Sequence, residues 1–351
     1  MTDLISKCLS ARFSRDVQIS AVSGSGSLDT VKDHYLLNNF LIDEYSSPYI
    51  EAIVVEVCSR VGMPRENIHL FVTPSSDFQA SCYAVSDHDC LISLSSALVD
   101  LLDAEELKFV FGHELGHYLF KHYLLLDVGK DSIEHLSLQR AQEISCDRIG
   151  LMSCEDLSHA TSAIIKTTSG LKTEYLGLNV GQFIDQLSKL SSPATSGEYK
   201  STHPTFLIRC RALLWFSTSI DYAGDNDVLN EKELDVINSR VETDLDQFID
   251  GPVKNLLQVK ERSYGIWSSL KLILLDGRFD RMEQSRFAQQ FGDEYLEKVK
   301  QLISSQSAAE LTLFVEEKYN ESKTEIEKCY PISADQILKK INFDAANMFS
   351  K

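Results

Sequence analysis

The chain has 351 residues, a formal net charge of −18 at pH 7 and a hydrophobic fraction of 43%. This length predicts two domains with ample residues to bury a core. The negative charge argues against binding to nucleic acid or to an anionic membrane surface, because their phosphates would repel the chain.

Cysteine usage and hydropathy suggest where the protein works. The eight cysteines form no Cys-x-x-Cys pair, and no signal-peptide pattern opens the chain, so we expect reduced thiols in the cytosol. No apolar run approaches the ~18 residues of a membrane-spanning helix, so we expect no integral membrane segment.

The first hundred residues predict a polar segment, helices and a small sheet. Residues 1–30 are polar and end in a Gly/Ser-rich turn or linker, although an inhibitory segment whose Cys8 caps a metal is an alternative. Residues 28–62 predict one or two helices. Three short strands are expected at 68–73, 79–85 and 90–94.

The run 103–119 predicts a buried helix with a metal-binding motif, and a capping box begins it at Asp103. It contains His-Glu-x-x-His. Residues four apart face the same side of a helix, so His113 and His117 can hold one metal ion. Glu114 lies one residue round the helix, where it can act as a general base without binding the metal. This is the arrangement of a zinc peptidase.

A catalytic zinc usually needs a third protein ligand. His122 does not fit, because the pattern with a third histidine requires a glycine turn and a different spacing, and His135 is a lone alternative. The next predicted helix places Glu143 and Asp147 one turn apart on one face. Glu143 would complete a His-His-Glu site for one zinc per chain, and Asp147 could accept the outward N–H of a ligand histidine.

The sequence from about residue 50 to 215 resembles the HtpX-like and CAAX-prenyl-protease-like zinc peptidases of peptidase family M48. The residues that carry the resemblance are 105–117, 142–150, Thr202-His203-Pro204 and Arg209. The resemblance implies that Glu143 is the third zinc ligand and that Arg209 belongs beside the ligand residues. It also implies that His203 lies over the metal and helps to hold the tetrahedral oxyanion.

The likeness to such gluzincin peptidases also implies that the strand at 79–85 is an edge strand of the sheet and would bind an extended peptide. There the family usually has Asn-Ala before an aromatic residue, and this chain has Ser81-Cys82-Tyr83 instead. Many members of the family carry transmembrane helices, and this sequence predicts none. Helices at 156–170 and 203–219 are expected to close the peptidase domain.

From about residue 221 the chain is charged and helical. Asn230 and Asp280 are each followed three residues later by glutamate, which predicts two helix starts. An EF-hand does not fit, because the required glycine and final acid are missing. The pattern from Asp276 to Glu283 resembles the tellurite-resistance TerB-like helical domains, which implies a role in interaction or regulation. Two further helices are expected, at about 292–320 and 333–348.

The sequence thus predicts an α+β gluzincin peptidase domain at 31–220, followed by an all-α domain at 221–351 that could bind a protein partner. The predicted activity is that of a cytoplasmic zinc metalloendopeptidase acting on protein or peptide substrates. Two alternatives remain. One is a zinc-bound scaffold or sensor in which the helical domain is the working part, and the other is a repressor-cleaving regulatory gluzincin.

Overall fold

A computed structural model describes most of the chain, which divides into two compact units. Unit 1 comprises Met1–Asp127 with Ser137–Ile249, and unit 2 comprises Val128–Leu136 with Asp250–Lys351. The described residues are 2–16, 29–86, 88–125, 132–177, 180–186, 201–219, 229–276 and 278–349.

Unit 1 contains a mixed four-stranded sheet with the order β1-β2-β4-β3. The central strands β2 and β4 are parallel, and the outer strands pair with them antiparallel. All residues of β4 are buried, whereas β3 lies at the edge and is partly exposed. Strand β3 is therefore one of the two edge strands, as expected, and within the described residues it pairs only with β4. The strands are β1 Phe40–Leu41, β2 Ile68–Thr73, β3 Ala80–Ala84 and β4 Cys90–Ser95.

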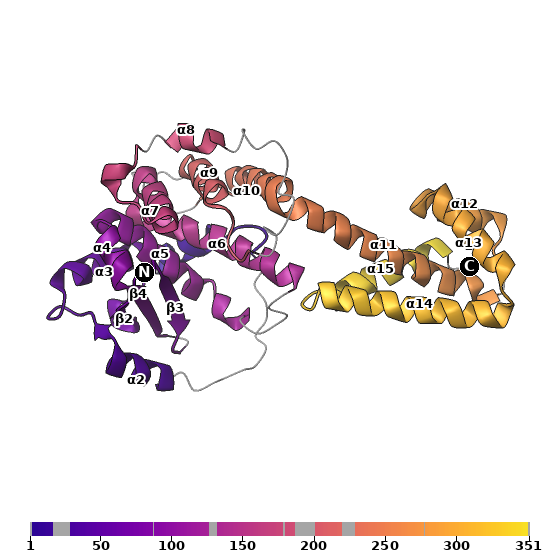
Figure 1. The fold of residues 1–351 in the computed structure, drawn as a ribbon, viewed down its shortest axis with the longest axis horizontal. Helices are drawn as coiled ribbons and strands as arrows, with labels where there is room; N and C mark the ends of the chain where they lie inside the picture. Colours follow the sequence, from indigo (N-terminus) through magenta and orange to yellow (C-terminus); the bar gives the residue numbers. More distant parts are fainter. Residues whose placement is uncertain are drawn as a thin grey trace. The chain divides into compact units, whose positions relative to one another are not determined.

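Helices surround this sheet and supply most of the core of unit 1 (Figure 1). A hydrophobic cluster joins α3, the strands, α5, α7 and α9, and a second cluster joins α6, α9 and α10. The helices are α1 Thr2–Ser10, α2 Asp29–Asn38, α3 Pro48–Val61, α4 Ser96–Leu101, α5 Ala104–Leu119, α6 Ile133–Cys154, α7 Leu157–Ser169, α8 Val180–Ile184, α9 Phe206–Ser217 and α10 Glu231–Leu245. The mostly helical chain with its small mixed sheet agrees with the expected α+β class.

The helical expectation for 28–62 missed β1 and the turn that follows it. Asp43 Oδ1 accepts hydrogen bonds from the backbone N–H groups of Tyr45 and Ser46, which fixes a local turn. Pro48 then begins α3 at a position where its missing N–H costs nothing. Helix periodicity alone overlooked these turn residues.

The N-terminal residues belong to unit 1 and not to a separate polar segment. Residues 2–10 form α1, and Cys8, Ala11 and Phe13 are almost fully buried in the core clusters of the unit. Cys8 is therefore a core residue, which argues against a thiol that caps the metal. The Gly/Ser-rich stretch at 23–27 lies outside the described residues.

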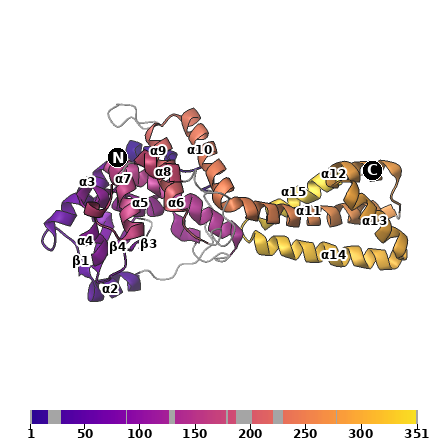
Figure 2. The same ribbon diagram turned by 45° about the horizontal axis from the view of Figure 1, so that its top comes forward.

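The described part of unit 2 contains five α-helices (Figure 2). Both views show α14 running beside α11, and these helices pack against each other. The core contains Phe287, Leu270 and Val315 in one cluster and Tyr264 with Ile326 in another. The helices are α11 Gly251–Ile273, α12 Arg281–Phe291, α13 Asp293–Ser305, α14 Ala308–Cys329 and α15 Ala334–Phe349.

Two boundaries in the second half differ from those expected. The units divide at Ile249 and Asp250, because α10 packs into the core of unit 1, whereas the sequence placed the change at residue 221. The helix expected at 292–320 is two helices, because Ser307 and Glu310 form a capping box that begins α14. Both expected helix starts are present, with Asn230 capping α10 and Asp280 capping α12.

Among the described residues, none of the helices combines the length and the apolar composition that crossing a membrane would require.

Candidate metal centre and peptide cleft

Helix α5 carries the His-Glu-x-x-His residues, and hydrogen bonds fix its N-terminus. Asp103 and Glu106 form the predicted capping box, in which each side chain accepts a hydrogen bond from the other residue's backbone N–H. Glu106 also accepts hydrogen bonds from Ser162 and from Lys166 on α7, at 2.5 and 2.7 Å. These bonds fix the start of α5 against α7. They thereby help to hold the position of the histidines that lie further along α5.

Glycines bring α5 and α6 close together. A Cβ atom at Gly112 would overlap Ser153, one at Gly150 would lie 2.8 Å from Phe109 O, and one at Gly116 would lie 3.0 Å from the α-carbon of Cys146. The two helices therefore meet almost backbone to backbone, at a separation that only glycine permits. This close approach brings Glu143 of α6 to the histidines of α5.

Three side chains converge in the way that a tetrahedral metal site requires. His113 Nε2 lies 3.3 Å from His117 Nε2 and 3.4 Å from Glu143 Oε2, and His117 Nε2 lies 3.4 Å from Glu143 Oε1. Zinc bonds of about 2.0–2.1 Å in a tetrahedron place ligand atoms about 3.3–3.4 Å apart. Glu143 Oε2 is also buried without a hydrogen-bond donor among the described residues. The three residues therefore fit a zinc ion.

The electrostatics of the cluster favour a positive charge at this position. Burial alone would lower the pKa of His113, but the carboxylates of Glu143 and Asp147 raise it to about 10. Burial alone would raise the pKa of Glu143, but His113 and His117 hold it well below its usual range. Glu143 is therefore ionised, and without a metal the cluster retains a proton. A divalent cation can replace that proton.

Asp147 lies behind His113, on the side of the ring away from the other candidate ligands. Its Oδ1 is 3.0 Å from His113 Nδ1, so it can accept the outward N–H of this ring, as the sequence predicted. Arg209 of α9 donates to both oxygens of Asp147 at 2.8 and 2.6 Å. Arg209 Nη2 also lies 3.8 Å from Glu143 Oε2. The resemblance placed Arg209 beside the ligands, and the structure puts it there.

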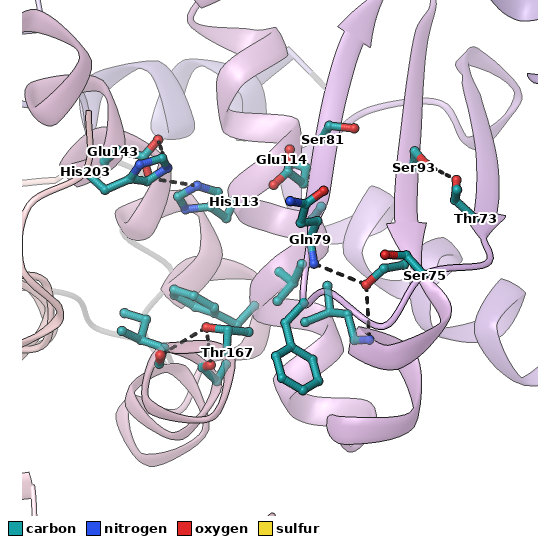
Figure 3. Close-up of a pocket in the computed structure, with 18 of the residues that line it drawn as sticks. Thr73, Ser75, Gln79, Ser81, Ser93, His113, Glu114, Glu143, Thr167 and His203 are labelled. Atoms are coloured by element: carbon teal, nitrogen blue, oxygen red, sulfur yellow. Dashed lines mark hydrogen bonds and ion pairs between the residues drawn. The ribbon is translucent and has the colours of Figure 1, made fainter. Parts of the chain in front are cut away.

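Glu114 lies in the cleft and outside the ligand cluster. Figure 3 shows its carboxylate beside the segment that carries Gln79 and Ser81, with His113 and Glu143 on the other side. Burial raises the pKa of Glu114 above that of an ordinary carboxyl group. A base with a raised pKa holds a transferred proton more readily near neutral pH.

His203 approaches the cluster from the segment before α9. Its Nε2 lies 3.5 Å from Glu143 Oε1, and its side chain is 59% exposed. The Thr202 hydroxyl lies 2.7 Å from His203 Nδ1 and can donate to it, which leaves the proton of the ring on Nε2. Arg140 anchors this segment through a 2.7 Å hydrogen bond to Ser201 O. His203 is thus placed to donate from Nε2 into the cleft.

Two adjoining cavities run along the edge strand. The larger has a volume of about 560 Å³ and the smaller about 280 Å³, and Ser81, His113, Glu114, Glu143 and His203 line both. Tyr83 lines the larger cavity and Cys82 the smaller, so every residue that we expected to bind substrate borders the cleft.

Sequence reasoning missed a second group of residues behind His117. His122 Nδ1 lies 3.0 Å from His117 Nδ1, and His122 Nε2 lies 3.0 Å from Asp16 Oδ2. His117, His122 and Cys146 are close enough to form a further candidate metal-binding group. The signal in the sequence was His122 itself, which the spacing argument treated only as a direct ligand. His135 is buried elsewhere on α6 and belongs to neither group.

Comparison with known proteins finds a similarity to one peptidase family over part of the chain. Residues 44–133 match the model described as "Peptidase family M48", a span that contains both histidines and Glu114 and ends before Glu143. Plastoglobule-localized metallopeptidase 48 of Arabidopsis thaliana is 26% identical over 201 residues, which cover 49% of this chain and 58% of that protein. A protease HtpX homolog of Thermococcus kodakarensis is 30% identical over 80 residues, covering 23% of this chain and 27% of that protein.

A second HtpX homolog, from Methanocaldococcus jannaschii, is 23% identical over 88 residues, covering 25% of this chain and 30% of that protein. The matches with these relatives thus span less than two thirds of each relative's length. Residues 44–133 are thus similar to peptidase family M48, and the relatives described above are named as metallopeptidases or proteases.

Proposed function

We propose that this protein is a zinc-dependent metalloendopeptidase with a gluzincin-type site, and that His113, His117 and Glu143 hold one zinc ion per chain. The observation that carries the proposal is the convergence of their ligand atoms at 3.3–3.4 Å beside a buried glutamate that is not a ligand. A zinc ion bound there would polarise the scissile carbonyl and lower the pKa of a water molecule.

The chain's own residues would perform the proton transfers. Glu114 would accept a proton from the attacking water and later deliver it to the leaving amine, because its carboxylate lies in the cleft beside the ligands. His203 would donate a hydrogen bond from Nε2 to the carbonyl oxygen as negative charge develops on it. Asp147 would hold the His113 ring in the orientation that leaves its Nε2 lone pair free.

The cleft would bind an extended peptide or an unfolded segment of a protein. The free edge of β3 offers backbone N–H and C=O groups that can pair with a substrate strand. Ser81, Cys82 and Tyr83 lie on this strand, and Leu98 and Ile164 are among the apolar residues that line the larger cavity. This apolar part of the lining would accommodate an apolar side chain of the substrate.

The cellular setting and the second unit are part of the proposal. All eight cysteines are free and six of them are buried, which favours a reducing compartment such as the cytosol. The role of the helical unit in interaction or regulation, and its likeness to TerB-like domains, stay predictions.

Replacing Glu114 by glutamine tests the mechanism. Glu114→Gln removes the base and keeps the size of the side chain, so peptide hydrolysis should fall by about 10²–10⁴-fold while zinc content stays at one per chain. Glu105→Gln is the matched control, because Glu105 lies on the same helix and is 39% exposed. It should keep full activity.

The same experiment separates the enzyme from a scaffold. A scaffold would bind zinc but hydrolyse nothing, in both the wild type and the variant. If zinc-loaded wild-type protein cleaves no peptide or protein substrate from a broad library, or if Glu114→Gln cleaves as fast as wild type, the proposed function is wrong.

A further inference from the structure

The N-terminal segment reaches the metal centre through a chain of hydrogen bonds. Asp16 is only 3% exposed, and its Oδ2 lies 3.0 Å from His122 Nε2. The other ring nitrogen of His122 lies 3.0 Å from His117 Nδ1, on the side of His117 away from the candidate metal position. Asp16 is thus linked through the ring of His122 to His117, a proposed zinc ligand.

When His117 binds zinc, only one placement of the protons satisfies the hydrogen bonds between His117, His122 and Asp16. A neutral imidazole that binds metal through Nε2 carries its proton on Nδ1. His117 Nδ1 then donates to His122 Nδ1, so the proton of His122 must lie on Nε2. That N–H donates to the carboxylate of Asp16, and every donor in the chain has an acceptor.

Each of the two candidate ligand histidines is therefore hydrogen-bonded, directly or through one ring, to a buried aspartate. Asp147 accepts directly from His113 Nδ1, and Asp16 accepts from the His117 ring through His122. We propose that Asp16 and His122 are positioning residues that orient His117 for zinc, so that the N-terminal segment completes the metal centre. This inference rests on the proposed zinc site.

The segment is fixed in a way that keeps Asp16 in place. The Phe13 backbone N–H donates to Ser145 Oγ, and Arg148 donates to Ala11 O, so both 3.0 Å bonds join the segment to α6. Arg12 donates to Phe120 O at 3.0 Å and lies over the Phe120 ring, at the end of α5. The segment is thereby held against both helices that carry the proposed ligands.

A second metal ion is the rival explanation for these residues. Cys146 Sγ lies 3.6 Å from His122 Nδ1, and it could join His117 and His122 around another ion. His122 Nδ1 has only one lone pair, however. In the hydrogen bonds described above, that lone pair accepts the N–H of His117 and cannot bind a metal ion as well. The two explanations therefore predict different zinc stoichiometries.

The test measures zinc affinity and ligand geometry in the full-length protein. Asp16→Ala and His122→Gln should each raise the zinc dissociation constant, measured by competition with a chromophoric chelator, by about 10–100-fold. Both should also change the visible absorption spectrum of the cobalt-substituted protein, which reports the geometry around the ion. Asp16→Asn keeps an acceptor oxygen without the charge, so its affinity should lie between those of Asp16→Ala and wild type.

A matched control comes from the same segment. Ser14 makes an exposed hydrogen bond to Glu242, and Ser14→Ala should leave both affinity and spectrum unchanged. Circular dichroism of the metal-free proteins identifies any variant that fails to fold, in which case Asp16→Asn decides the test.

Three results would overturn the inference, and they differ from one another. If wild type binds one zinc tightly and the Asp16 and His122 variants keep its affinity and spectrum, the positioning role is wrong while the proposed function stands. If wild type binds two zinc ions and Cys146→Ser removes one, the residues form a second metal site instead. If wild type binds no stoichiometric zinc, the proposed function fails and this inference fails with it.

Discussion

Arg209 meets both carboxylate oxygens of Asp147, with its Nε 2.8 Å from Oδ2 and its Nη2 2.6 Å from Oδ1. Burial alone would raise the pKa of Asp147, but the neighbouring guanidinium and the His113 ring keep it below its usual value. The buried carboxylate is therefore ionised, and Arg209 and the His113 ring stabilise its negative charge.

The first prediction concerns this ion pair. Arg209→Met should lower the free energy of unfolding by about 3–5 kcal/mol, because it leaves a buried carboxylate without its cation. Urea denaturation of the metal-free protein measures the change. Lys172→Met is the control, since it breaks an exposed pair with Asp100 and should have little effect. Equal stabilities of the two variants would contradict the role of Arg209.

The second prediction concerns the orientation of His113. Asp147→Asn should weaken zinc binding by about 10–100-fold, because the amide is a poorer acceptor for the His113 N–H and can flip to present a donor instead. Chelator competition measures the change. Asp156→Asn makes the same substitution at the N-cap of α7, where asparagine caps equally well, so zinc affinity should not change. A zinc affinity at the wild-type level in Asp147→Asn would speak against the orienting role.

The third prediction separates transition-state stabilisation from metal binding. His203→Ala should reduce kcat by about 10²–10³-fold, the usual loss for one oxyanion donor, and should retain one zinc per chain. Steady-state kinetics on a peptide substrate and metal analysis together check this. His159→Ala removes a surface histidine on α7 and serves as the control. Loss of zinc from His203→Ala would mean that His203 is a ligand and not a donor.

The fourth prediction tests the close contact of α5 with α6. Gly112→Ala should destabilise the protein by about 1–3 kcal/mol through overpacking against Ser153, although alanine favours helix formation by itself. Thermal or urea unfolding measures this. Gly177→Ala adds the same methyl group where the described part of the chain, apart from the adjacent residues, has no atom within 4 Å, so it should have little effect. A Gly112→Ala variant as stable as wild type would show that the helices can separate without cost.

The fifth prediction concerns the stretch of chain before α10, which belongs to unit 1. We expect limited proteolysis to cut near residues 221–227, which lie outside the described residues. The two fragments should nevertheless elute together in size-exclusion chromatography, because Ile237, Val241 and Leu245 of α10 are buried in the core of unit 1. A denaturing gel confirms the cut. Fragments that elute separately would place α10 with the helical unit, as the sequence boundary at residue 221 expected.

The sequence predicted those parts of the site that depend on local spacing. The capping box at Asp103 and the facing pair His113 and His117 follow from short-range patterns, and the structure shows both. The edge position of β3 was expected from the likeness to gluzincin peptidases, and the structure shows it too. The position of Glu143 beside the histidines also agrees with the family resemblance. The roles that we assign to these residues are proposals.

The features that the sequence did not reveal depend on distant parts of the chain. Asp16 meets His122 across 106 residues, and no local pattern marks an aspartate within a polar segment as buried. The boundary at residue 221 followed a change in composition, whereas α10 joins unit 1 through an apolar face whose partner lies elsewhere in the sequence. The helix break before α14 was missed because the capping box at Ser307 was overlooked within a long helical pattern.

The glycines of α5 have a consequence for how this protein tolerates mutation. Gly112 and Gly116 are four residues apart and face α6, while His113 and His117 are each one position further on and face the cleft. A scan of all substitutions along this helix should therefore find two rows of positions, about 100° apart around the helix, at which substitutions are harmful. One row would be harmful for chemical reasons and the other for steric reasons. The glycine positions carry no reactive group, yet substitutions there should lower the stability of the protein because they force α5 away from α6.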